Sequence, residues 1–113
     1  MTDTLRMKDT LRMKDQKQNF RNVSYNSPEP VYATQGSFSG ELFLHWDAVK
    51  NAGKYIIEMS RRKTNGWEQV DIIKDPKYCL TGLKPGKEYL FRVAAVFPGG
   101  KGPWSSEIVK KVK

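Results

Sequence analysis

Cysteine, histidine and long apolar runs are scarce in this chain of 113 residues. Cys79 is the single cysteine, so no disulfide can form within the chain. This excludes a small secreted scaffold that is stabilised by several disulfides. The start, MTDTLRMKDT, lacks the apolar run of a secretory signal, and no stretch approaches the ~18 apolar residues of a membrane span. We therefore predict no membrane span. We also predict a cytoplasmic location if the chain is full length, and an extracellular one stays open if it is a segment of a longer protein.

Groups that could perform catalysis are equally scarce. His45 is the single histidine, and together with Cys79 it falls short of the three or four ligands of a zinc site. The two side chains could lie close together on one sheet face, but a flat face offers neither a pocket nor an oxyanion hole. The glycine-rich stretch at residues 99–102 joins two predicted strands, whereas a phosphate cradle needs a helix after it. The sequence therefore predicts a protein that is not an enzyme and uses no cofactor or metal.

Basic residues outnumber acidic ones, 20 to 12, which gives a net charge of +8. The excess is spread along the chain, with +3 in residues 1–21 and +5 in residues 22–113. No recognised nucleic-acid motif accompanies the charge, so we interpret it as a solvated basic surface and do not expect nucleic-acid binding as the main function.

The N-terminal part contains a perfect tandem hexapeptide, TLRMKD, at residues 4–9 and 10–15. Its alternation of apolar and basic residues suits a strand, whereas Leu, Met, Lys and Arg prefer helix. This conflict predicts disorder, or structure only on a partner. Because the prolines of Ser27-Pro28-Glu29-Pro30 favour an extended linker, we place a disordered basic tail and linker at residues 1–27 and one domain at residues 28–113.

After this boundary, short alternating runs separated by turn residues are typical of a β-sandwich. We expect strands at residues 30–34, 41–46, 55–59, 67–73, 78–81, 89–97 and 105–112. Among the residues expected inside are Leu42, Leu44, Trp46, Tyr55, Ile57, Met59, Val70, Ile72, Tyr78, Leu80, Tyr89, Phe91, Val93 and Ala95, and Cys79 is expected to point outward. The prediction is an all-β, seven-stranded, two-sheet antiparallel β-sandwich with no helix.

Five spaced motifs together carry a family resemblance. They are LHWDAV with Trp46, Tyr55-Ile56-Ile57, LTGLKPGKEY at residues 80–89, FRVAAV, and GKGPWS at residues 100–105. In this order they resemble the fibronectin type III family over the C-terminal part of the chain. The resemblance implies that Trp46 fills the space between the sheets and that Leu83 and Tyr89 form a tyrosine corner, whose hydroxyl bonds to nearby backbone. These are structural residues, so the resemblance implies a scaffold without naming its function.

The segment GPWSSE also resembles half of the WS box of cytokine-receptor domains, in which a tryptophan stacks on an arginine. Trp104 and Arg92 occupy the matching positions here, so a cation–π contact is expected. The second Trp-Ser pair and the disulfides of that family are missing. We interpret the likeness as shared architecture rather than receptor function.

The functional hypothesis is a monomeric, non-catalytic module that binds or spaces proteins, with a partner whose identity the residues do not reveal. Its candidate interaction surface is the outer face of the third, sixth and seventh strands, formed by Ile56, Glu58, Arg61, Arg92 and Lys110 and bordered by Trp104. One alternative is nucleic-acid or anionic-surface binding through the basic tail and Arg61-Arg62-Lys63. Another is a carbohydrate-binding accessory role through Trp67 or Trp104.

Overall fold

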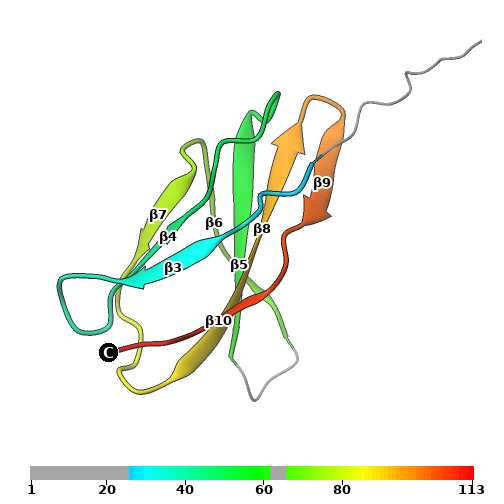
Figure 1. The fold of residues 1–113 in the computed structure, drawn as a ribbon. Coiled ribbons are helices and arrows are strands. Elements are labelled where there is room, and N and C mark those ends of the chain that lie inside the picture. Colours follow the sequence, from blue (N-terminus) through cyan, green and yellow to red (C-terminus); the bar gives the residue numbers. More distant parts are fainter. Residues whose placement is uncertain (1–25, 62–65) are drawn as a thin grey trace, which may run out of the picture.

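The computed structural model describes residues 26–61 and 66–113 (Figure 1). The tandem hexapeptide lies outside the described residues, as do residues 1–25 of the tail and linker predicted to be disordered at residues 1–27. The described part of the chain forms eight strands and no helix. The strands are β3 (Tyr32–Gln35), β4 (Leu42–His45), β5 (Lys54–Arg61), β6 (Glu68–Ile73), β7 (Lys77–Leu80), β8 (Glu88–Phe97), β9 (Gly100–Trp104) and β10 (Ile108–Lys111).

The strands pair into two antiparallel sheets that face each other as two layers (Figure 1). The smaller sheet has the order β3-β4-β7. The larger has the order β10-β8-β5-β6, and β9 also pairs with β8. Side chains alternate between the core and the solvent along most of these strands, as in β4, where Leu42 and Leu44 are buried and Phe43 and His45 are exposed. The predicted two-sheet antiparallel β-sandwich is confirmed.

The last predicted strand starts earlier than expected and is interrupted. It begins at Gly100 as β9, breaks after Trp104 and resumes as β10. At the break, the Ser105 backbone N–H donates to the Val93 carbonyl over 2.7 Å, and the Ser105 hydroxyl accepts from the Val93 N–H over 3.0 Å. The serine side chain thus supplies an acceptor that the backbone ladder lacks there. This interruption explains why eight strands form where seven were predicted.

Aromatic and branched side chains from both sheets fill the space between the layers. Trp46 and Tyr89 are 5% and 4% exposed, which confirms both as core residues. The Trp46 ring meets Tyr55 edge-on at 5.3 Å between centroids, a favourable geometry for two aromatic rings. The predicted tyrosine corner is also present, because the Lys84 backbone N–H donates to the Tyr89 hydroxyl over 3.0 Å.

In β6, one inward assignment is wrong. Ile72 is 43% exposed, whereas Val70 and Ile73 pack against the core. The pairing of β6 with β5 shifts register between Ile57 and Glu58, so β6 carries one extra residue at this point. An extra residue reverses the alternation beyond it, which turns Ile72 outward and Ile73 inward.

Candidate functional site

The outer face of the larger sheet brings four of the predicted surface residues together. Ile56 of β5 and Trp104 of β9 both lie opposite Ala94 of β8, on either side of it. One step along the sheet, Glu58 of β5 lies opposite Arg92 of β8. Opposite residues of antiparallel strands project to the same face. Ile56, Glu58, Arg92 and Trp104 therefore occupy neighbouring positions on the outer face.

The register corrects the expected placement of Arg61 and Lys110. Both pair with Tyr89, Arg61 from β5 and Lys110 from β10. Because Tyr89 points into the core, these two residues lie on the inner side of the sheet, where β5 and β10 end. In β10 the outer positions are instead Val109 and Lys111, opposite Leu90 and Glu88.

Arg92 is the centre of a stack of aromatic rings and cations. Its guanidinium carbon lies 4.2 Å from the Trp67 ring centroid and 4.3 Å from that of Trp104. The Lys101 ammonium lies 4.4 Å from the same Trp104 ring. Lys101 sits opposite Val96, two residues beyond Ala94 and away from Arg92, so the two cations approach Trp104 from different sides along the sheet. We call Lys101, Trp104, Arg92 and Trp67 the cation–π ladder, which confirms the expected contact of Trp104 with Arg92.

Glu58 holds the arginine of the ladder in place. Its Oε1 accepts hydrogen bonds from Arg92 Nε over 2.9 Å and from Nη2 over 2.6 Å. The side chains of Arg92 and Glu58 are only 22% and 19% exposed, so water screens this pair less than an exposed one. The ion pair and the stacked rings together restrict Arg92 to one orientation.

Two members of the ladder were not in the predicted surface. Trp67 precedes β6, and Lys101 is the second residue of β9, ahead of the predicted last strand, so neither lies on the three strands chosen for the surface. The expected contact of Trp104 with Arg92 was the signal that could have predicted Trp67 as a member. A guanidinium has two faces, so an arginine stacked on one ring can stack on a second. The same packing bears on the carbohydrate alternative. Arg92 and Lys101 both lie over the Trp104 ring and Arg92 lies over the Trp67 ring, which reduces the ring surface on which a sugar could stack.

His45 and Cys79 lie on adjacent strands of the smaller sheet and have different partners. Cys79 pairs with Phe43, and its Sγ lies 3.6 Å from Glu41 Oε2. The His45 ring stacks on Tyr32 at 5.1 Å between centroids. Local desolvation and the Glu41 carboxylate raise the pKa of the Cys79 thiol, which disfavours the nucleophilic thiolate. Cys79 is exposed, as predicted.

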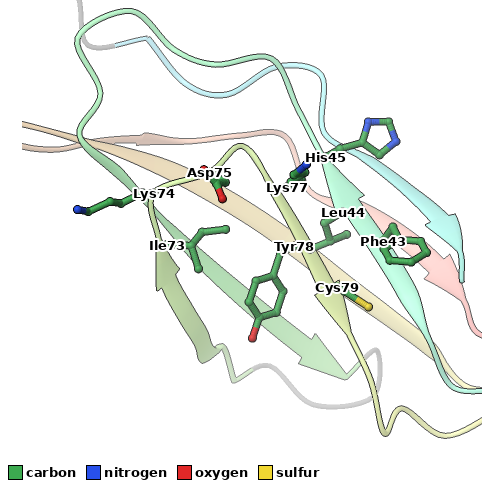
Figure 2. Close-up of a pocket in the computed structure, with 9 residues that line it drawn as sticks. All are labelled: Phe43, Leu44, His45, Ile73, Lys74, Asp75, Lys77, Tyr78 and Cys79. Atoms are coloured by element: carbon green, nitrogen blue, oxygen red, sulfur yellow. The ribbon is translucent and has the colours of Figure 1, made fainter.

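A hollow of about 660 Å³ lies beside these residues, where the edges of the two sheets diverge (Figure 2). It is lined by Phe43, Leu44, His45, Ile73, Lys74, Asp75, Lys77, Tyr78 and Cys79. Burial, followed by a hydrogen bond to Asp71, raises the pKa of Tyr78, so its hydroxyl is a proton donor at neutral pH. The residues that line the hollow thus include the aromatic rings of Phe43 and Tyr78, a neutral phenol, and charged side chains of both signs.

Within residues 26–61 and 66–113, no three His, Cys, Asp or Glu side chains group as ligands for a metal ion. The same part of the chain contains no helix long and apolar enough to cross a membrane.

A comparison against known families agrees with the two-sheet sandwich. The profile of the family described as "Fibronectin type III domain" matches residues 26–111. The chain belongs to the fibronectin type III family. Among curated relatives, it is 33% identical over 82 residues to titin of Drosophila melanogaster and 34% identical over 90 residues to Protein sidekick-1 of Gallus gallus.

These matches cover most of this chain and little of the relatives. They span 68% and 73% of this chain, but 0% of titin after rounding and 4% of sidekick-1. Solved fibronectin type III structures share the fold. A fibronectin type III-like protein from Clostridium thermocellum has a TM-score of 0.65 at 24% identity, covering 74% of this chain and 92% of that one. A titin segment has a TM-score of 0.70 at 21% identity, covering 80% of this chain and 32% of that one.

Proposed function

We propose that this fibronectin type III domain is a non-catalytic module that binds or spaces other proteins, and that the outer face of β5, β8 and β9 is its contact surface. The observation that carries the proposal is the cation–π ladder beside Ile56. Tryptophan and arginine are the residues most enriched at energetically dominant positions of protein interfaces. Here they are already held in one conformation by Glu58 and by each other, so a partner would lose little affinity to ordering them.

The relatives support the coarser part of this proposal. Titin and sidekick-1 each contain a segment similar to this chain that is a small part of a much longer protein. A domain of this fold is thus repeatedly used as one module among others. The cytoplasmic location expected from the sequence remains a prediction.

The test is a quantitative comparison of proteins captured from an extract of the source cells. Ile56→Lys adds a charge beside the ladder, and Thr34→Lys adds the same charge on the smaller sheet as a matched control. Thr34 is exposed, whereas Ile56 is partly buried, so Ile56→Lys is expected to cost more stability, and thermal melts must show that both variants are folded at the temperature of capture. A partner retained by Thr34→Lys and depleted at least about tenfold by Ile56→Lys supports the proposed face. Equal capture by both variants contradicts it.

A further inference from the structure

One end of the sandwich gathers basic side chains from separate segments of the chain. The end of β5, the turn before β8, and β10 with the two residues after it all lie at this end (Figure 1). We call the following six residues the basic end: Arg61, Lys84, Lys87, Lys110, Lys111 and Lys113. The sequence places them in three segments, and only the fold brings them together.

The tyrosine corner organises this cluster. Tyr89 lies between Arg61 of β5 and Lys110 of β10 as the direct partner of both. Its hydroxyl accepts a hydrogen bond from the Lys84 backbone N–H over 3.0 Å. Three basic residues are therefore positioned around the buried Tyr89: Arg61 and Lys110 by strand pairing, and Lys84 by its backbone hydrogen bond. Arg61 and Lys110 thus lie at the basic end and not on the ladder face.

Backbone hydrogen bonds join the remaining members. The Gly86 N–H donates to the Val112 carbonyl over 2.7 Å, and the Val112 N–H donates to the Lys87 carbonyl over 2.9 Å. The Lys113 carbonyl accepts from the Gly40 N–H over 2.8 Å. The turn before β8 and the C-terminal segment are therefore tied to each other. The backbone that carries these charges is ordered before any ligand arrives.

Few acidic groups offset the charge. Glu88 lies opposite Lys111 and is the acidic residue within the cluster. The nearby Glu41 is directed into the β3–β4 connection, where its Oε1 accepts from the Ser37 N–H over 2.8 Å. Within the described part of the chain, Lys84, Lys87 and Lys111 form no ion pair. A positive potential therefore remains at this end of the domain.

We propose that the basic end binds an extended acidic segment of a protein partner, at a surface separate from the ladder face. Carboxylates match the chemistry of the basic end, since five of its six charges are lysine ammoniums. These charges are accessible, because Lys110 is partly exposed and the other five residues are exposed.

Nucleic-acid bases would find one exposed ring nearby, that of Phe38 in the β3–β4 connection, whose neighbour Ser39 donates a hydrogen bond to the Lys113 carbonyl. Tyr89 itself is buried, so the segments that carry the charges offer no series of rings on which successive bases could stack. Among the large apolar side chains of the described residues, the exposed ones near this end are Val109 and Phe38, which fall short of the continuous apolar face that inserts into a membrane.

The experiment uses the full chain and a fluorescent oligoglutamate peptide of about twelve residues as the probe, with binding followed by anisotropy. Lys84→Glu with Lys87→Glu reverses two charges at the basic end. Lys50→Glu with Lys54→Glu reverses two exposed charges near the opposite end of β5 and changes the net charge equally. A neutral pair, Lys87→Gln with Lys111→Gln, is included in case the reversed pair does not fold, and all melting curves are recorded.

We expect the Lys84 and Lys87 reversal to weaken oligoglutamate binding by about tenfold or more, and the Lys50 and Lys54 reversal by less than about threefold. The neutral pair should weaken it by about threefold to tenfold. Binding should also weaken between about 50 and 200 mM NaCl. Equal losses in the two reversed pairs would show attraction by net charge alone and overturn the proposal, as would no binding at low salt. Tighter binding of a single-stranded oligothymidylate or of phosphatidylserine vesicles, with the same dependence on Lys84 and Lys87, would overturn the assignment to a protein partner.

Discussion

At the scale of single residues, Trp46 shows how much of the core depends on one side chain. It is buried between the sheets and packs edge-on against Tyr55. Its indole Nε1 is buried and has no hydrogen-bond partner among the described residues. The contribution of Trp46 to stability therefore comes from its volume and apolar surface rather than from its polar atom.

Replacing Trp46 by alanine should lower the free energy of unfolding by about 3 to 5 kcal/mol, because a large cavity opens between the sheets. Trp46→Phe should cost clearly less, since it keeps a ring and removes an N–H that has no partner. Urea denaturation of the two variants measures both effects. A Trp46→Ala protein that melts within a few degrees of the wild type would contradict the central role of this side chain.

Cys79 is a second residue whose environment sets its chemistry. Because desolvation and the negative charge of Glu41 raise the pKa of its thiol, alkylation by iodoacetamide should rise with pH later than for a free cysteine peptide. Glu41→Gln removes the charge and keeps an acceptor for the Ser37 N–H, so the pKa should fall and alkylation at pH 8 should become faster. An unchanged pH profile in Glu41→Gln would show that the carboxylate does not act on the thiol.

At the scale of elements, two tyrosine hydroxyls tie connections to strands. Tyr89 in β8 accepts from the Lys84 N–H in the connection after β7, and Tyr55 in β5 accepts from the Val49 N–H over 2.8 Å in the connection after β4. Both rings are buried, so removing a hydroxyl leaves the packing of the rings largely intact. The two residues therefore form a matched pair for measuring what such a bond contributes.

We expect Tyr89→Phe and Tyr55→Phe each to lower the free energy of unfolding by about 1 kcal/mol, the usual net value of one hydrogen bond. Amide exchange should locate the loss, with faster exchange at Lys84 in the first variant and at Val49 in the second. Faster exchange of both amides in both variants would show that the connections are not held independently.

The register shift in β6 gives a test within a single element. Ile73 packs against the core after the extra residue, and Ile72 points outward. Ile73→Ser should therefore destabilise the domain by about 1 to 2 kcal/mol, whereas Ile72→Ser should change stability by less than about 0.5 kcal/mol. Thermal melts of the two variants are sufficient. A larger loss of stability for Ile72→Ser than for Ile73→Ser would show that Ile72 points inward, as the uninterrupted alternation in the sequence predicted.

At the scale of the whole molecule, residues next to the predicted boundary at residue 27 pack against the domain. Pro28 is buried, and the Glu29 carboxylate accepts from the Ser106 N–H over 3.0 Å. The segment before β3 is thus attached to the segment between β9 and β10. The predicted boundary between a tail at residues 1–27 and a domain at residues 28–113 remains a proposal.

Deletion of residues 1–24 tests that boundary. Because the attachments at Pro28 and Glu29 are kept, we expect the melting temperature to remain within about 4 °C of the full chain, which corresponds to roughly 1 kcal/mol for a domain of this size. A larger decrease would show that the tandem hexapeptide contributes to the fold. Protection of alternate amides along the hexapeptide in the full chain would have the same meaning.

The sequence by itself determined the class of fold, the sandwich core and the tyrosine corner. These depend on local alternation and on motifs such as LTGLKPGKEY, in which Leu83 and Tyr89 are near in the chain. A strand period of two also placed Trp46 inside and Cys79 outside, because each lies in a run without an extra residue.

Only the tertiary structure decided the rest, because the remaining features depend on how strands align. Cross-strand register moved Arg61 and Lys110 from the outer face to the surroundings of Tyr89. An extra residue in β6, visible only against β5, turned Ile72 outward. The ladder of Trp67, Arg92 and Trp104 and the basic end join residues that are distant in the chain, and their contacts exist only once both sheets have formed. One residue of slip reverses every side chain of a strand, so a pattern read along one strand cannot settle what faces what across a sheet.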